Sequence, residues 1–179
     1  MQDGAFSASA LKSVVIEGSE TKFVDTATGT KGAFANCVQL TDVKFMAEKL
    51  TAGSLGQNLF YGCTALSNVT LPAKATEIGK RMFEGCTNLK TITLPATVTT
   101  LLDYCFKDSG LTAIDLGNIT TIKQNAFDGC VGLTSVTIPS TWTTIPNTLF
   151  RGTGLTSIVI PEGVTKIENE AFNNCEKLT

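Results

Sequence analysis

The chain has 179 residues, of which 42% are apolar, and it carries a net charge of −2 with an isoelectric point of about 5.2. This composition can form a continuous core, and its charge gives no positive field for nucleic acid or an anionic membrane. No apolar stretch reaches the ~20 residues that a membrane-spanning helix needs. Histidine is absent, which removes the commonest general base and the most frequent metal ligand. We therefore expect no nucleic-acid partner, no membrane insertion by this segment, no metal and no cofactor.

From the N-terminus onward, one phenylalanine recurs in each unit of an internal repeat. These residues are Phe6, Phe34, Phe60, Phe83, Phe106, Phe127, Phe150 and Phe172. The first two intervals are 28 and 26 residues, and the later ones are 23, 23, 21, 23 and 22. A leucine follows each phenylalanine after five or six residues. A fixed period of this length predicts a solenoid, in which each unit buries its apolar face against its neighbours.

Four of these leucines open a segment with the pattern Leu-x-x-(Val/Ile)-x-(Leu/Ile)-Pro, as in residues 66–72 and 133–139, and other units follow it without the proline. The alternation of apolar and polar residues predicts a half-buried strand, and the proline ends it because it has no N–H to donate. A second short apolar pair follows, such as Val98 and Leu101, and then a polar corner that carries the phenylalanine. The sequence therefore predicts a β-rich solenoid with one short parallel strand per unit and corners formed by turns or short helices.

Two polar stretches interrupt this pattern near the N-terminus. Residues 17–31, from Glu17 to Lys31, form an insertion, and residues 46–58 replace the segment after the strand. Either stretch is a candidate binding loop, although tolerated surface loops have the same composition. The chain begins halfway through one unit and stops where a strand should start. We expect a single solenoid domain over residues 1–179, with about seven to eight repeats, truncated at both ends and irregular over residues 1–58.

The cysteines follow the repeat as well. Three residues after the phenylalanine stand Cys37, Cys63, Cys86, Cys130 and Cys175. Ser9, Ser109 and Thr153 take that position in the remaining units, which suggests a small, weakly polar donor for a turn carbonyl. We predict a buried structural ladder of these five cysteines with Phe60, Phe83, Phe106, Phe127, Phe150 and Phe172. Disulfides or a metal site in this row remain open alternatives, although no Cys-x-x-Cys pair occurs, and the redox state of Cys105 stays open.

The solvent-facing strand positions form the candidate binding face. They are Asp42, Lys44, Asn68, Thr70, Thr91, Thr93, Asp115, Ser135, Thr137 and Ser157. A sheet surface of this kind is the usual binding face of a solenoid, although threonine also simply suits an exposed strand. It contains no aromatic residue on which a sugar could stack.

Other polar residues give little sign of chemistry. A second threonine row contains Thr76, Thr99, Thr120, Thr143 and Thr165. The positions beside this row are mixed, which argues against a flat ice-binding surface. The acids Asp103 and Asp128 fall at different repeat positions, and Glu84 and Glu170 are expected on solvated corners. No paired acid with a plausible partner emerges, so we expect no enzymatic activity.

The repeat resembles the BspA-type leucine-rich repeats of bacterial surface proteins. The resemblance rests on Leu-x-x-Ile-x-Leu-Pro-x-x-Val-Thr-x-Ile followed by Ala-Phe-x-x-Cys, as at residues 126–130 and 171–175. It covers residues 32–179 well and residues 1–31 more loosely. It implies a right-handed leucine-rich repeat superhelix and an extracellular or cell-surface protein, with adhesive roles for some members and no shared catalytic motif.

From the resemblance and the polar face together, the sequence predicts a non-catalytic adhesion or binding module of an exported surface protein. The expected partner is a protein or glycan of a host or neighbouring cell, and we expect a monomer. The alternative is a purely structural spacer between other domains.

Overall fold

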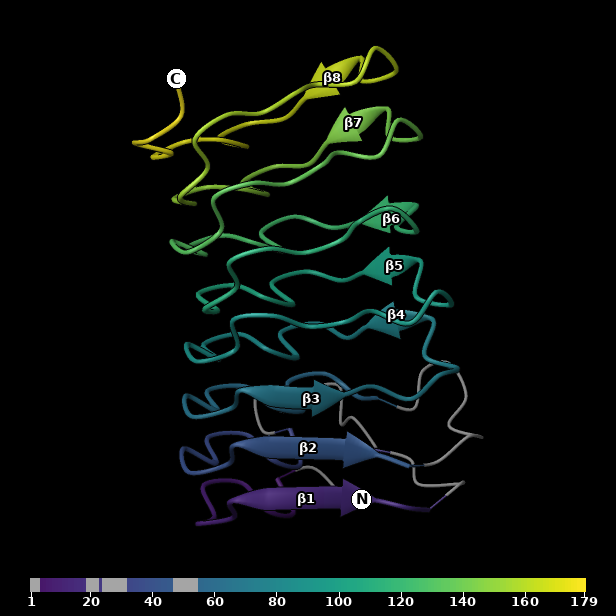
Figure 1. The fold of residues 1–179 in the computed structure, drawn as a ribbon, viewed down its shortest axis with the longest axis vertical. Helices are drawn as coiled ribbons and strands as arrows, with labels where there is room; N and C mark the ends of the chain where they lie inside the picture. Colours follow the sequence, from purple (N-terminus) through teal and green to yellow (C-terminus); the bar gives the residue numbers. More distant parts are fainter. Residues whose placement is uncertain (1–3, 19–22, 24–31, 47–54) are drawn as a thin grey trace.

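The structure is a computed structural model that describes residues 4–18, 23, 32–46 and 55–179. The chain winds turn upon turn into a stack, and the turns are joined by short parallel strands (Figure 1). The described residues contain no helix, and hence none that could cross a membrane. The corners of the described turns are therefore formed by tight turns. The predicted parallel-strand β-solenoid is confirmed.

The strands lie on two sides of each turn. On the first side, β1 (Ser13–Ile16), β2 (Asp42–Phe45) and β3 (Asn68–Thr70) pair in parallel in the order β1-β2-β3. On the second side lie β4 (Glu77–Ile78), β5 (Thr100–Leu101), β6 (Thr121–Ile122), β7 (Thr144–Ile145) and β8 (Lys166–Ile167). These form two separate ladders, β4-β5-β6 and β7-β8. Figure 1 shows the arrows of the two sides pointing in opposite directions.

The prediction of a paired strand behind every leucine is wrong for the later turns. Residues 91–94, 113–116, 135–138 and 157–160 form no strand. The β1–β2 pair is closed by the Met46 N–H, which donates to Ile16 O at 2.9 Å. From β3 onward this position holds a proline or Gly117, whose N–H donates to Asp115 Oδ1 at 2.8 Å. The ladder on the first side therefore lacks one N–H donor in each of these turns. Only isolated hydrogen bonds join the turns there, such as the bond from the Thr112 N–H to Lys90 O at 2.9 Å.

The phenylalanine corner is joined by hydrogen bonds between successive turns without interruption. The Phe83 N–H donates to Cys105 O at 2.8 Å, and the Phe106 N–H donates to Ala126 O at 3.0 Å. The rings stack from Phe6 to Phe172 with centroids 5.3 to 5.8 Å apart and planes within 15° of parallel. The corner is therefore the continuous spine of the stack.

Apart from the Phe34 corner, where only Asn36 is left-handed, each corner reverses direction through left-handed residues on both sides of the phenylalanine. In one turn these are Arg81 (φ 54°) and Gly85 (φ 74°), two residues before and two after the ring. Asparagine, aspartate and glycine hold most of the equivalent positions, as expected where φ is positive. A Cβ added at Gly129 would meet Asp108 Oδ1 of the preceding turn, so that side chain would have to move as well.

The cysteine row lies inside the corner, and its thiols satisfy carbonyls of the preceding turn. Cys63 Sγ donates to Phe34 O at 3.1 Å, and Cys86 Sγ donates to Phe60 O at 3.2 Å. The corresponding bonds from Cys37, Cys130 and Cys175 are 3.0, 3.0 and 3.1 Å long. All six cysteines are free thiols.

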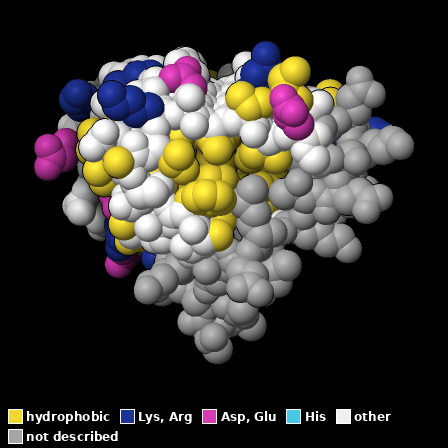
Figure 2. Space-filling view, turned by 90° about the horizontal axis from the view of Figure 1, so that it is seen from below, with side chains coloured by type: hydrophobic (Ala, Val, Ile, Leu, Met, Phe, Trp, Pro, Cys, Tyr) yellow, Lys and Arg dark blue, Asp and Glu magenta, His cyan; other side chains and the backbone are white. Residues whose placement is uncertain are grey.

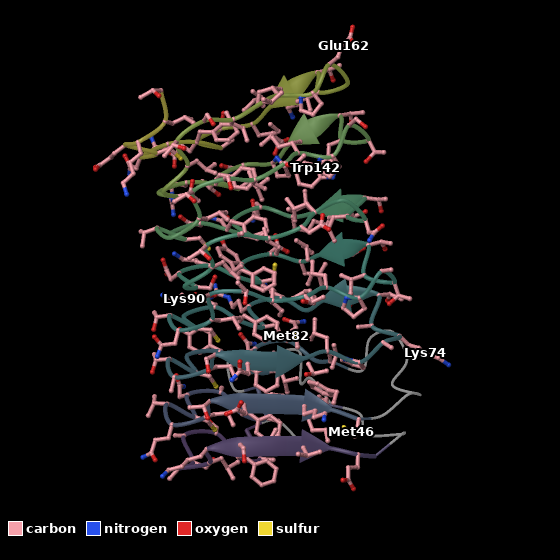
Figure 3. All side chains as sticks on the ribbon, in the orientation of Figure 1. Met46, Lys74, Met82, Lys90, Trp142 and Glu162 are labelled. Carbon is pink, nitrogen blue, oxygen red and sulfur yellow. The ribbon has the colours of Figure 1, made fainter. Side chains whose placement is uncertain are left out.

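The core is a column that runs the length of the stack. Phe60, Phe83, Phe106, Phe127 and Phe150 are fully buried, and Met82 lies inside the column while Lys74, Lys90 and Glu162 point outward (Figure 3). Phe172 and Cys175, in the last described turn, are only half-buried. Viewed from the β1 end, apolar side chains gather at the centre of the stack (Figure 2), and Phe6, the first ring of the row, is 40% exposed.

Candidate binding face

All ten residues of the candidate binding face have exposed side chains. Asp42 and Lys44 lie on β2, and Asn68 and Thr70 lie on β3. The remaining six continue the same side of the stack through the later turns, where the chain forms no strand. The face is therefore a polar strip that crosses successive turns.

The part of the face on β2 and β3 is held by hydrogen bonds across turns. Asn68 Nδ2 donates to Asp42 Oδ1 at 2.8 Å, and Thr41 Oγ1 donates to Asp42 Oδ2 at 2.6 Å. These bonds, first from Thr41 and then from Asn68, lower the pKa of Asp42 below its ordinary value. Lys44 stands in register with Thr70 on the neighbouring strand. This end of the face presents one fixed anion and one cation.

Farther along, the missing ladder bonds leave two adjoining hollows between turns. One has a volume of about 470 Å³ and is lined by Thr91, Ile92, Ala113, Ile114, Asp115, Leu116 and Thr137. The other, of about 140 Å³, is lined by Ile92, Thr93, Leu94, Pro95, Val98, Asp115, Asn118 and Ile119. Ile92 and Asp115 belong to both. The structure thus brings four predicted face residues, Thr91, Thr93, Asp115 and Thr137, around a partly apolar floor.

The other predicted binding segments contribute less. Ser135 and Ser157 extend the face beyond the hollows and are exposed. Most of residues 17–31, and residues 47–54 of the second irregular stretch, lie outside the described residues. Phe23 and Leu55, described residues from these stretches, are buried and form an isolated parallel bridge.

A charged network on the phenylalanine corner was not foreseen. The residues that follow Phe83, Phe106, Phe127 and Phe150 are Glu84, Lys107, Asp128 and Arg151, which alternate in sign from turn to turn. The sequence prediction that Glu84 is solvated is wrong, because only 8% of it is exposed and Arg81 binds it at 3.1 Å. The alternation of charge at this one repeat position was the signal in the sequence that could have predicted the network.

Asp128 is the centre of this network. Arg151 holds its carboxylate with two bonds, Nη2–Oδ2 at 2.7 Å and Nε–Oδ1 at 2.9 Å, and Lys107 Nζ lies 3.3 Å from Oδ2. Burial opposes ionisation of Asp128, but hydrogen bonds from Arg151 and Asn125 and the charge of Lys107 outweigh it and lower the pKa. For Glu84 burial is the larger effect and raises the pKa. The carboxylates of Asp128 and Glu84 are thus bound by basic side chains of the corner itself.

Two features of the described residues bear on metal binding and on thiol reactivity. Among them, no group of three or more histidine, cysteine or acidic side chains could hold a metal ion. Burial raises the pKa of the Cys63 and Cys130 thiols to about 12. A thiol with such a pKa is protonated at neutral pH and is a poor nucleophile.

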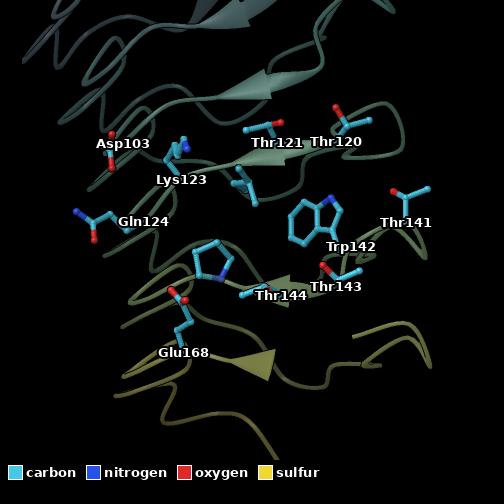
Figure 4. Close-up of a pocket in the computed structure, with 12 residues that line it drawn as sticks. Asp103, Thr120, Thr121, Lys123, Gln124, Thr141, Trp142, Thr143, Thr144 and Glu168 are labelled. Atoms are coloured by element: carbon cyan, nitrogen blue, oxygen red, sulfur yellow. The ribbon is translucent and has the colours of Figure 1, made fainter. Parts of the chain in front are cut away.

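A third hollow lies on the second side, between β6 and β7, and was also missed (Figure 4). Its volume is about 450 Å³, and Trp142 lies at its centre with threonines of both turns around it. Pro146 also lines it. A proline and a tryptophan at positions that neighbouring turns fill with other residues were the sequence signals for this site.

The winding, the rows of buried leucine and phenylalanine and the exposed strand face define a leucine-rich repeat solenoid. A family model, that of the BspA-type leucine-rich repeat region, matches residues 53–179 in six copies. The chain belongs to this family, and the resemblance inferred from the sequence is confirmed.

Solved structures show the same fold. A leucine-rich repeat protein from Bacteroides ovatus is 28% identical with a TM-score of 0.78, over 92% of this chain and 44% of that protein. The leucine-rich repeat protein of T. pallidum is 27% identical with a TM-score of 0.78, over 94% of this chain and 78% of that one.

A leucine-rich cell surface protein from Faecalibacterium prausnitzii shares the fold alone, at 21% identity and a TM-score of 0.52, over 99% of this chain and 75% of that one. This chain thus spans less than half of the B. ovatus protein and about three quarters of the other two. No curated protein matches the sequence significantly.

Proposed function

We propose that this chain is a non-catalytic binding module of an exported surface protein, which takes a protein or glycan ligand on its candidate binding face. The observation that carries the proposal is the polar strip of ten exposed side chains with its two adjoining hollows. The family membership supports it, since leucine-rich repeat domains of bacterial surface-type proteins generally serve protein interaction.

The chemistry of the face supports a ligand with both apolar and hydrogen-bonding groups. Half-buried Ile92 and Ile114 form the floor of the larger hollow, and threonine hydroxyls with the Asp115 carboxylate surround it. An apolar floor with a few convergent polar groups is the usual composition of a binding site. The rigid corner behind the face holds these groups in place, which lowers the entropic cost of binding.

The location is part of the same proposal. The F. prausnitzii protein of the same fold is a cell surface protein. We infer an extracellular or cell-surface location for this chain. We also infer that the chain acts as a monomer, and analytical ultracentrifugation tests this oligomeric state.

Arrays of purified matrix proteins and glycans test the proposal. The intact chain is expected to bind at least one of them, and Thr93→Lys is expected to weaken that binding by about tenfold, because a long cation fills the smaller hollow. Thr87→Lys, which changes an exposed threonine on the corner, is the matched control and should bind like the wild type. Absence of any ligand, or equal loss in both variants, would contradict a binding face and favour a spacer.

A further inference from the structure

The ladder on the second side is interrupted between β6 and β7. Between β5 and β6, which do pair, the Lys123 N–H donates to Leu101 O at 3.0 Å and the Thr120 N–H donates to Thr99 O at 2.9 Å. Between β7 and β8, which also pair, the Glu168 N–H donates to Ile145 O at 2.9 Å and the Thr165 N–H donates to Thr143 O at 2.9 Å. No corresponding hydrogen bond joins β6 to β7, although both strands are fully described.

Two residues cause this interruption. Pro146 stands where Lys123 and Glu168 donate in the adjacent turns, and it has no N–H to give to Ile122 O. Trp142 stands where the adjacent turns have Ile119 and Val164, and its Nε1 donates to Ile119 O at 2.7 Å. The indole, only 4% exposed, fills the inner side of the gap. The gap is therefore encoded by the sequence and is backed by a rigid floor.

The gap presents two complementary strand edges to the same hollow of about 450 Å³. On the β6 edge, the carbonyls of Thr120 and Ile122 receive no main-chain hydrogen bond from β7. On the β7 edge, the N–H groups of Thr143 and Thr144 donate none to β6. Unpaired strand edges are templates for another extended chain.

The side chains at one end of the hollow add a charge pattern. Asp103 and Lys123 both line this end of the hollow (Figure 4), and neither forms an ion pair among the described residues. The Glu168 carboxylate, also at this end, is already bound by Lys166 and the Asn147 N–H. An occupant therefore meets one acid and one base that are available for pairing.

We propose that the hollow between β6 and β7 binds an extended segment of a partner polypeptide, which runs parallel to both strands and joins them. Its N–H groups donate to the carbonyls of β6, and its carbonyls accept from the N–H groups of β7. Its inward residues are small, such as glycine or serine, because the Trp142 indole already occupies the interior. Its charged residues meet Asp103 and Lys123. This site lies on the opposite strand side from the candidate binding face, so it stands independently of the proposed function.

A selection with short random peptides on phage tests this proposal. The intact chain is immobilised, and a variant with Trp142→Val and Pro146→Lys is present in solution as competitor. This double variant restores the residue types of the adjacent turns and is expected to close the ladder. A second variant, Thr121→Arg, changes an exposed residue at the hollow and keeps the core intact. The strand-face variant Thr93→Lys is the control.

The proposal expects peptides rich in small residues that bind the intact chain and Thr93→Lys equally. Their affinity should fall about tenfold or more with either hollow variant, because the double variant closes the ladder and the Thr121→Arg side chain obstructs the hollow. It should fall similarly when alternate peptide amides are N-methylated, because the peptide then loses ladder bonds. Bound peptide should slow amide exchange at Thr143 and Thr144. Selection of peptides that still bind both hollow variants, or insensitivity to N-methylation, would overturn the proposal. A glycan whose binding alone is lost with the hollow variants would also overturn it.

Discussion

The phenylalanine corner and the two strand sides of each turn differ in how regularly they repeat. At the corner, backbone hydrogen bonds and stacked rings run from the first described turn to the last. On the strand sides, pairing stops after β3 on the first side and between β6 and β7 on the second. The corner therefore fixes the stacking of the turns, and the strand sides are free to vary from turn to turn.

This difference separates the part of each turn that stabilises the stack from the part that varies between turns. Between its two end turns, the corner buries the phenylalanines, the cysteine row and the charges of Asp128 and Glu84. The hollows form where ladder bonds are missing, beside Asp115 on the first side and beside Trp142 on the second. A rigid frame that carries variable, partly open sides is the general arrangement by which solenoids present binding sites.

The largest expected contrast is in thiol reactivity. Burial raises the pKa of Cys63 to about 12 from an ordinary value of 9.0, so at neutral pH its thiolate fraction is about a thousandfold lower. In the native chain the buried thiols of the corner should resist a thiol reagent, and half-buried Cys175 should react first. Peptide mapping after timed labelling measures the order, with the denatured chain as control. Fast native labelling at Cys63 would contradict the closed corner.

The next largest effect should come from the middle of the ring column. Phe106→Ala removes stacking with Phe83 at 5.4 Å and Phe127 at 5.8 Å and leaves a cavity, at a cost of about 3–5 kcal/mol in unfolding free energy. On the strand side, half-buried Ile92→Ala should cost only about 1 kcal/mol. Urea unfolding compares the two, and equal losses would mean that the corner is not the spine.

A smaller effect, with a pH dependence, is expected at Asp128. Asp128→Asn breaks the charged bonds from Arg151 and should cost about 1–3 kcal/mol near neutral pH. Because folding lowers the pKa of Asp128 below its ordinary value of 3.8, the ionised carboxylate stabilises the fold fully above that value. The difference between wild type and variant should therefore shrink as the pH falls through the folded pKa. Unfolding curves across acid pH measure it, and a pH-independent difference would contradict the network.

The smallest predicted effect is a gain. Thr148 is a β-branched residue at φ 53° on the corner, where the equivalent position in other turns holds Asn58 and Asn125. Thr148→Asn should raise the unfolding free energy by about 1 kcal/mol, since asparagine tolerates the left-handed region better. The converse change, Asn174→Thr at φ 58°, should lower it by a similar amount. Thermal unfolding of the two variants decides whether corner strain limits stability.

The repeat, the fold class and the burial of the corner could be predicted from sequence because they depend on spacing. One phenylalanine and one leucine per unit are enough to require stacking. Pairing on the strand sides could not be predicted in the same way. It depends on single residues at positions where the repeat pattern accepts several residue types. Pro146 and Gly117 each remove one donor, and the consequence appears only when the neighbouring turn is in place.

The sequence by itself determined that the chain is a leucine-rich repeat solenoid with a polar strip along one side. Periodicity is sufficient for this, since each apolar row has only one way to be buried. Only the tertiary structure decided which threonines surround a hollow, that Glu84 and Asp128 are buried in ion pairs, and that β6 and β7 stay unpaired beside Trp142. Apart from the Arg81–Glu84 pair, these features arise from contacts between residues about one repeat apart, whose distances no pattern within a single unit contains.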